Sequence, residues 1–361
     1  MRTTPTLAAV AATVLALGAP VAGAQDFYEG RTLEMIINYG PGGPTDIEGR
    51  IVARHLAEHI PGNPDIVVRN MAGAAGATGI NFLGEVADND GYTMGFFTWN
   101  PVDQILDSPA LRVRLENFEL IAGFEQPLVV YVRRDAGTGL ETQADIVNVG
   151  EVTAGASGTQ SPAVLRMTLA LDILGVPHRL VTGYQGARGV QTAVMQGEVD
   201  LTTNSLPGYR GATEPVLVEP GIAMPLFYFD FLQDDGSVGP LETLTDMPSF
   251  LEVYRAVHGA DAIPEGQKWD LLLLLNGLMD RMYRTVFLPP DAPDEAVEIL
   301  REAFVALSQD PDFVEEYVSV VKNQPSMVVA ADGEAIIDEL ANIDEETKAF
   351  LAAFVDEIAQ R

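Results

Sequence analysis

Hydrophobic and polar positions along the first third of the chain repeat in a strand, turn and helix order. The run at 32–39 is apolar enough for a strand, and residues 46–60 place apolar side chains on one helical face. A second unit follows, with a strand at 65–69 and a helix at 80–86, and then a strand at 93–98. Two consecutive βα units predict a parallel sheet whose ligand lies at the carboxyl ends of its strands.

The same order restarts further along, which predicts a second α/β unit. Ser161 and Pro162 fit the N-cap and the first position of a helix that runs to about residue 174. The expected strands lie at 128–132, 152–156, 178–182, 199–203 and 222–229, with a further helix at 190–196. Beyond residue 230 the pattern is helical, at 268–283, 294–307, 312–321 and 334–358. We therefore predict a first lobe over 25–128, a second over 129–228, and a return to the first lobe with C-terminal helices over 229–361.

Residues 1–24 have the pattern of a secretory signal peptide. Met1 and Arg2 form a short positive region, Leu7 to Leu17 an apolar stretch, and Ala22-Gly23-Ala24 a small-residue cleavage site before Gln25. Spanning a membrane takes about 17–25 apolar residues, more than this stretch provides. We expect an exported protein that begins at or near Gln25.

Cysteine content and charge exclude several classes. The chain has no cysteine, which excludes a lipid-anchored lipoprotein, a thiol enzyme, a disulfide scaffold and a cysteine-ligated metal site. Its net charge of −31 makes nucleic acid and anionic membranes poor partners. This acidity fits either a solvated surface in a salty periplasm or a surface for a basic partner.

The turn after the first strand is the main candidate for binding chemistry. Residues 39–46 read Tyr-Gly-Pro-Gly-Gly-Pro-Thr-Asp and lead into a helix. Such a corner presents backbone N–H groups and the positive end of a helix dipole, which together hold phosphates and carboxylates. Thr45 and Glu48 have the spacing of a capping box. Similar turns occur at 73–79 and 157–162.

Five segments together resemble one family. The runs NYGPGGPTDIEGRIVARHLAEHI, NMAGAAGATGINFLGEVADNDGYTM, GASGTQSP, VTGYQGARGVQTAVMQGEVDL and NSLPGY are similar to the extracytoplasmic solute-binding receptors of tripartite tricarboxylate transporters, the Bug/TctC family. The match covers roughly residues 27–210. The first turn departs from the Phe-Pro-Pro-Gly-Gly more usual in that family, and residues 230–290 are longer and more helical than expected.

The resemblance implies an α/β, two-lobed periplasmic-binding-protein type II fold with a helical C-terminal part. It implies a periplasmic protein, expected to be a monomer without cofactor or metal, that closes over a small carboxylate and delivers it to membrane permease subunits. The ligand-binding residues that it implies are Tyr39, Gly42, Gly43, Thr45, Asp46, Gly76, Thr78, Ser157, Thr159, Ser161, Tyr184 and Asn204.

Purely structural roles stay open for several of these residues. Asp46 could serve only the helix dipole, Tyr39 could be a core aromatic, and the 157–161 side chains could bond only within their own turn. Tyr184 and Asn204 could equally lie outside the site.

The same residues also bear on other functions. A binding protein that signals to a sensor kinase is an alternative that the sequence does not separate from transport. An exported dinucleotide enzyme is disfavoured because residues 40–43 lack the G-x-G-x-x-G spacing. His55 and His59 form an H-x-x-E-H run like that of some zinc peptidases. We expect it to be metal-free, because it lies at the far end of the helix from the glycine turn.

Overall fold

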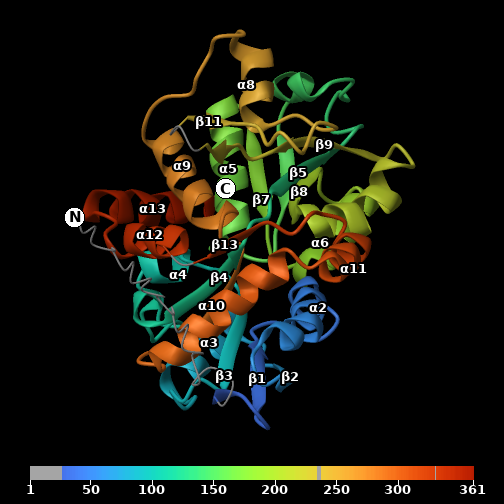
Figure 1. The fold of residues 1–361 in the computed structure, drawn as a ribbon. Helices are drawn as coiled ribbons and strands as arrows, with labels where there is room; N and C mark the ends of the chain where they lie inside the picture. The colour runs from blue at the N-terminus through green and yellow to red at the C-terminus, as the bar shows by residue number, and fades with distance from the viewer. Residues whose placement is uncertain (1–26, 234–236, 330) are drawn as a thin grey trace, which may run out of the picture.

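The computed structural model describes residues 27–233, 237–329 and 331–361. The signal-peptide prediction for residues 1–24 lies outside this range. Within it the chain folds around two sheets, which form the lower and upper lobes in Figure 1. We call them lobe 1 and lobe 2.

Lobe 1 is built on a six-stranded mixed sheet in the order β13-β4-β12-β3-β1-β2. β1 pairs in parallel with both β2 and β3, as the two βα units predict, whereas β12 and β13 are antiparallel to their neighbours. The strands are β1 (Thr32–Ile37), β2 (Asp65–Asn70), β3 (Thr93–Thr98), β4 (Glu119–Phe124), β12 (Arg284–Leu288) and β13 (Met327–Val329).

Lobe 2 is built on a five-stranded sheet in the order β7-β6-β8-β5-β9. β6 is parallel to β7 and β8, and β5 is antiparallel to β8 and β9. The strands are β5 (Leu128–Arg133), β6 (Val152–Gly155), β7 (His178–Val181), β8 (Leu201–Ser205) and β9 (Ala223–Tyr228). A two-stranded ribbon, β10 (Phe231–Leu232) with β11 (Val238–Gly239), follows β9.

Helices cover both sheets. Those packed on lobe 1 include α2 (Pro44–His59), α3 (Ala77–Glu85), α10 (Asp294–Ser308) and α11 (Pro311–Val321). Those packed on lobe 2 include α5 (Pro162–Leu174), α6 (Gly186–Gln196), α8 (Phe250–His258) and α9 (Gln267–Asp280). α12 (Ala331–Ala341) and α13 (Glu345–Ile358) lie at the left of Figure 1, beside α9. Short turns complete the chain: η1 (Ala74–Gly76), α4 (Val102–Ile105), η2 (Leu115–Asn117), η3 (Gln143–Asn148), α7 (Leu206–Gly208) and the π-helix η4 (Tyr209–Val218).

The lobes are joined by crossing segments that a few polar contacts hold together. Gln126, between β4 and β5, donates its backbone N–H to the carbonyl oxygen of Asp280 at 2.9 Å. Asp280 ends α9, and its carboxylate accepts two hydrogen bonds from Arg166 of α5, at 2.6 and 2.7 Å. Both side chains are fully buried. The segment that leads from α9 back to lobe 1 is thereby fixed to α5, a helix of lobe 2.

The two-lobed α/β fold that the sequence predicts is confirmed, and most expected elements lie within a few residues of their predicted bounds. Three details were wrong. The helix after the first turn begins at Pro44 with Gly43 as its N-cap, so Thr45 and Glu48 form no capping box. The run 334–358 is two helices, separated by a break at which Asp344 caps α13. The C-terminal third is not purely helical, because it returns β12 and β13 to the first sheet.

Candidate functional site

A cavity of about 550 Å³ opens between the two lobes and is the candidate site. Lobe 1 contributes the β1–α2 turn and the first turns of α2, and the end of α11. Lobe 2 contributes the start of α6 and the segment after β8. The lining residues are Gly40, Pro41, Gly42, Gly43, Pro44, Ile47, Glu48, Gln185, Gly186, Ala187, Arg188, Gln191, Asn204, Pro207, Gly208, Gly211, Ala212, Val320 and Val321.

The β1–α2 turn brings the N-terminus of α2 to the cavity. Gly42 has a left-handed φ of 75°, which a side chain would strain, and Gly43 caps the helix without any side-chain hydrogen bond. The first N–H groups of a helix have no acceptor within the helix, and its dipole is positive there. This part of the wall is therefore suited to an anion.

Asp46 holds this turn in shape and does not line the cavity. Its carboxylate accepts hydrogen bonds from Gly42 N at 2.8 Å, Arg50 Nε at 2.9 Å and Asn70 Nδ2 at 2.9 Å. Burial alone would raise the pKa of Asp46, but these hydrogen bonds outweigh it and lower that pKa. Asp46 thus stays ionised and fixes the backbone that the ligand would meet.

Beneath the turn lies a buried polar network centred on Glu48 and Arg284. Their charged groups are 3.0 Å apart, and each side chain is 2% exposed. Arg284 also donates to Thr98 Oγ1, which in turn lies 2.7 Å from Thr45 Oγ1. Gln126 of the crossing segment donates to the other Glu48 oxygen. Thr45 is therefore bonded to the sheet through Thr98, and the positive charge of Arg284 offsets the negative charge of Glu48.

Tyr39, Gly76 and Thr78 lie beside the cavity but do not line it. The Tyr39 hydroxyl donates to the carbonyl of Ala75 at 3.0 Å and so ties the first turn to the second. Burial raises the pKa of Tyr39 to about 12, which keeps that hydroxyl protonated. Gly76 has a φ of 102°, and a Cβ there would lie 2.6 Å from Asn38 Nδ2. The second turn therefore supports the first.

On lobe 2, the N-terminus of α6 faces the same cavity. The helix begins at Gly186, with Gln185 as an N-cap that makes no side-chain hydrogen bond. Arg188 lies in its first turn and is exposed. Tyr184, just before the helix, lies off the wall, with its hydroxyl 3.4 Å from Glu198.

The segment after β8 completes this wall. Asn204 lines the cavity, and its Nδ2 donates to Thr213 Oγ1 at 3.3 Å. Gln191 of α6 donates to the carbonyl of Ala212 at 2.9 Å and so joins this segment to α6.

The turn with Ser157, Thr159 and Ser161 does not line the cavity. It follows β6, and β6 lies between β7 and β8 in the sheet. All three strands run parallel, so the turn emerges at the same edge as the loops after β7 and β8, both of which do line the cavity. Ser161 is the N-cap of α5, as predicted, but it makes no side-chain cap hydrogen bond.

Of the twelve residues named from sequence, the cavity wall includes Gly42, Gly43 and Asn204. Sequence reasoning missed Glu48, Arg188 and the end of α11 as wall residues. Arg188 is the only charged residue in the glycine-containing run 184–189, and that charge was the signal available in the sequence. Nothing local to Val320 and Val321 indicates a binding role, because α11 reaches the cavity only through the tertiary fold.

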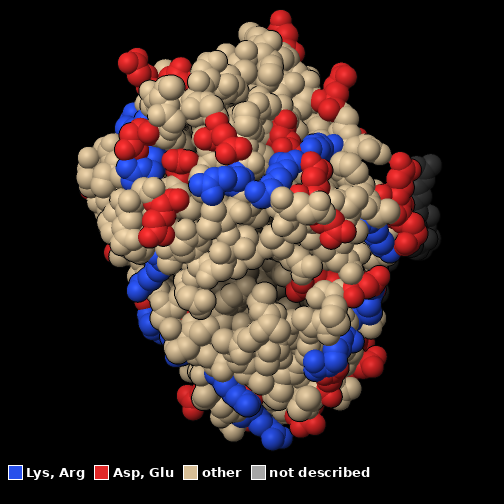
Figure 2. Space-filling model, turned by 180° about the vertical axis from the view of Figure 1, so that it is seen from behind, with Lys and Arg blue, Asp and Glu red and all other residues tan. Residues whose placement is uncertain are grey.

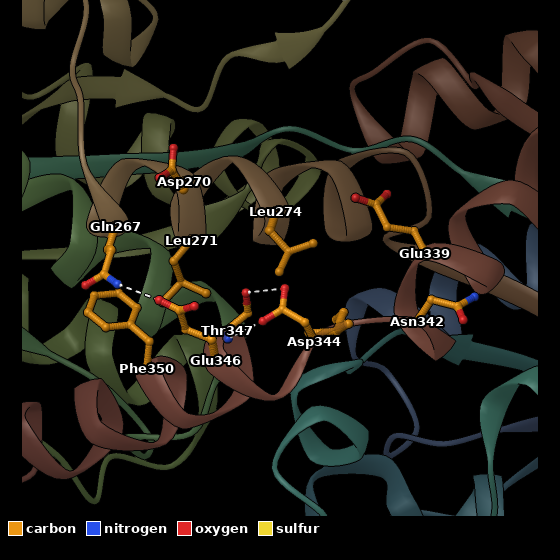
Figure 3. A pocket seen from close by; sticks show the side chains of 11 residues that line it. Gln267, Asp270, Leu271, Leu274, Glu339, Asn342, Asp344, Glu346, Thr347 and Phe350 are labelled. Atoms are coloured by element: carbon orange, nitrogen blue, oxygen red, sulfur yellow. Dashed lines mark hydrogen bonds between the residues drawn. The ribbon is translucent and has the colours of Figure 1, made fainter.

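A second cavity, of about 430 Å³, lies between α9, α12 and α13 (Figure 3). Four carboxylates, from Asp270, Glu339, Asp344 and Glu346, stand around it. Burial raises the pKa of Glu339. A carboxylate ligand would be repelled here, so this cavity does not suit the same chemistry.

The H-x-x-E-H run packs α11 against α2. His55 Nε2 lies 2.7 Å from Glu316 Oε2, and His59 Nε2 lies 2.9 Å from Asp310 Oδ2. The described part of the chain contains no group of three or more His, Asp or Glu side chains that could hold a metal ion. In that same part, no helix is long and apolar enough to cross a membrane.

Charge on the surface is mixed. On the face that Figure 2 shows, basic and acidic residues are interspersed, and uncharged residues cover its hollowed middle. The net charge of −31 therefore does not gather at that hollow.

Two curated proteins are similar in sequence. The chain is 30% identical over 196 residues to the UPF0065 protein in the TAR-I ttuE-ttuC' intergenic region of Agrobacterium vitis, a match over 51% of this chain and 55% of that protein. It is 41% identical over 78 residues to protein BugT of Bordetella pertussis, 22% of each chain. The matches thus span about half or less of these relatives. No protein-family model matches the chain.

Solved structures share the fold over almost their whole length. Rpa4515 of Rhodopseudomonas palustris, with adipate, superposes with a TM-score of 0.65 at 20% identity, over 90% of this chain and 98% of that one. A TctC solute-binding protein from Polaromonas gives 0.62 at 20% identity, over 91% and 99%. MatC of R. palustris, with bound malate, gives 0.57 at 18% identity, over 90% and 98%.

Proposed function

We propose that the chain is a member of the Bug/TctC family of extracytoplasmic solute-binding receptors and that it captures a small organic carboxylate between its two lobes in the periplasm. One observation carries the proposal: the N-termini of α2 and α6, from opposite lobes, both reach one cavity. Two positive helix ends with free backbone N–H groups form a clamp for an anion. The relatives with malate and with adipate support a carboxylate as that anion.

The residues proposed to contact the ligand fall into two groups. Gly42 and Gly43 present the lobe 1 backbone, and Asn204 stands on the lobe 2 wall. The turn with Ser157, Thr159 and Ser161 joins them when the lobes close, because it emerges between the two lobe 2 loops that already line the cavity. Six further residues do not contact the ligand but hold the turns in shape: Tyr39, Thr45, Asp46, Gly76, Thr78 and Tyr184.

Delivery to a tripartite tricarboxylate-type transporter completes the proposal. The family and the predicted signal peptide support it. The closed form is the one that permease subunits would recognise, because closure is the change that ligand binding produces on the outside of the molecule.

A thermal-shift screen tests the proposal. The chain from Gln25 is heated with malate, adipate, citrate and monocarboxylates, each at several concentrations, with uncharged sugars and amines of similar size as controls. A binding carboxylate at a hundred times its dissociation constant stabilises the fold by about 2.7 kcal/mol, whereas the controls leave the melting temperature unchanged. Stabilisation by the sugars or amines with no response to any carboxylate would overturn the assignment.

A further inference from the structure

Arg188 on the lobe 2 wall has an unpaired charge. It is the only Lys or Arg among the residues that line the interlobe cavity. Within the described residues its guanidinium makes no ion pair and no hydrogen bond, and only its carbonyl oxygen is used, by the Thr192 hydroxyl. By contrast Arg210, which lies between the wall residues Gly208 and Gly211 in the chain, pairs with both Glu214 and Asp246.

The place of Arg188 is not explained by stability. It lies in the first turn of α6, where the helix dipole is already positive and a basic side chain is unfavourable. The first turn of α6 contains no acidic residue to offset it. A bound anion would remove this cost, since it would supply the missing negative charge to both the guanidinium and the helix end.

The opposite wall already provides for one carboxylate by other means. There the N-terminus of α2 offers backbone N–H groups, and the charge of Glu48 is neutralised by Arg284. Much of the remaining wall is apolar, from Ile47, Val320 and Val321 and from several prolines. The cavity thus has an anion site on each lobe, together with surface suited to methylene groups.

We propose that Arg188 is a specificity-determining residue that binds a second carboxylate and makes this protein selective for aliphatic dicarboxylates. The inference rests on the proposed function and deepens it. The first carboxylate binds at the α2 turn, the aliphatic spacer contacts the apolar wall, and the second carboxylate pairs with Arg188. A charge-assisted hydrogen bond between guanidinium and carboxylate is geometrically specific, so a monocarboxylate of equal length loses it entirely.

Isothermal titration calorimetry with adipate and with hexanoate tests this, because the two probes have the same number of carbons and differ in one carboxylate. We expect the wild type to bind adipate about ten- to a hundredfold more tightly than hexanoate. Arg188→Gln should abolish most of this preference by weakening adipate binding, with hexanoate affinity changed less than about threefold. Arg188→Lys should retain part of the preference, since it keeps the charge but not the planar fork.

Arg179→Gln is the matched control, because Arg179 is exposed on β7 and does not line the cavity. It should leave both affinities unchanged. Thermal unfolding of each variant without ligand shows whether the fold is kept. Equal loss of adipate and hexanoate binding in Arg188→Gln, or an unchanged preference, would overturn the role of Arg188 while leaving the proposed function standing. Failure of the wild type to bind any carboxylate in the thermal screen would instead remove the proposed function itself.

Discussion

At the scale of single residues, the site depends on positions where side chains are missing. Gly43 has φ −81° and ψ 168°, an extended conformation that any residue can adopt. A Cβ built there meets nothing closer than the Gly40 carbonyl oxygen at 3.4 Å. The fold therefore has no strong need of glycine at this position, and the approach of a ligand to the backbone is what would need it.

We expect Gly43→Val to abolish ligand-induced stabilisation while the free protein loses no more than about 1–2 kcal/mol, the usual cost of a poorer N-cap. The valine side chain would stand between the carboxylate and the α2 N–H groups. Gly277→Val is the matched control, since a Cβ on α9 also meets nothing within 4 Å but lies away from the cavity. Retained carboxylate affinity in Gly43→Val, measured by calorimetry, would remove this turn from the site.

A second residue-scale prediction concerns Asp230, which lies just after β9. Burial raises its pKa to about 6 from the ordinary 3.8, against the hydrogen bonds from Ser249 and the Leu251 N–H. The folded state therefore holds a proton that the unfolded state has lost between these pH values. The contribution of Asp230 to the free energy of unfolding is thus greatest below about pH 4 and falls as pH rises through about 6.

Asp230→Asn should remove this term, since asparagine stays neutral and keeps an oxygen for the Leu251 N–H. Relative to wild type, the variant should become more stable by about 2–3 kcal/mol on going from about pH 4 to pH 7.5. Urea unfolding at the two pH values measures the difference. The exposed Asp261→Asn serves as control, and a pH-independent difference between Asp230→Asn and wild type would refute the raised pKa.

At the scale of elements, local pattern predicted those parts whose signals are local. The strand, glycine turn and helix of each βα unit could be predicted because periodicity and turn chemistry are confined to a few adjacent residues. β4, β12 and β13 were missed because each is a short apolar run, and β12 and β13 also lie among helical patterns. They become strands by pairing with each other across up to two hundred residues of chain.

In the site, too, locally encoded features were predicted and features that depend on the tertiary fold were not. The first turn was identified from its glycines, but the expected capping box failed because Pro44 starts the helix and Thr45 bonds Thr98 across the sheet. Arg188 and α11 gain a role only when the lobes face each other, and a linear sequence contains no signal for that. Sequence reasoning therefore identified the first turn and Asn204 as parts of the cavity wall, but not Arg188 or the end of α11.

The turn after β6 is the element whose role most needs a test. If it closes onto the ligand, Thr159→Val removes one hydroxyl donor and should weaken binding by about 1–3 kcal/mol, mainly through faster dissociation. If Thr159 bonds only within its own turn, the loss should stay below about 0.5 kcal/mol. Stopped-flow binding measures both rate constants, and unchanged kinetics would reduce Thr159 to a structural turn residue. Thr192→Val is the control. It also removes a threonine hydroxyl, which here donates to the Arg188 carbonyl oxygen within α6, but it lies outside the turn after β6.

At the scale of the whole molecule, the proposed function requires that the lobes move relative to each other. Each lobe has its own sheet, and two of the hydrophobic clusters lie within a single lobe. The largest buried cluster is continuous across both lobes, from Phe97 and Leu120 of lobe 1 to Val130 and Leu165 of lobe 2. The Arg166–Asp280 pair and the bond from Gln126 N to the Asp280 carbonyl hold the crossing segments together on the lobe 2 side. We therefore expect bending where the chain leaves this anchored point and enters β12, with the anchor itself preserved.

Closure predicts that the protein becomes more compact when it binds. The positive ends of α2 and α6 lie on the two sides of the cavity, so an anion that contacts both ends would favour a closed form over an open one. A shift from 1:99 to 99:1 takes about 5.5 kcal/mol of differential affinity between the closed and the open form. Small-angle scattering of the chain from Gln25 should show a smaller radius of gyration with saturating adipate.

The variants make this measurement specific. Gly43→Val should show no compaction at any adipate concentration, because the lobe 1 contact is lost. Arg188→Gln should require a higher concentration and then reach the wild-type dimension, because a ligand held by the first carboxylate still meets the α6 helix end. Tight binding by the wild type with an unchanged radius of gyration would mean that one lobe holds the ligand alone, and the clamp between the lobes would have to be given up.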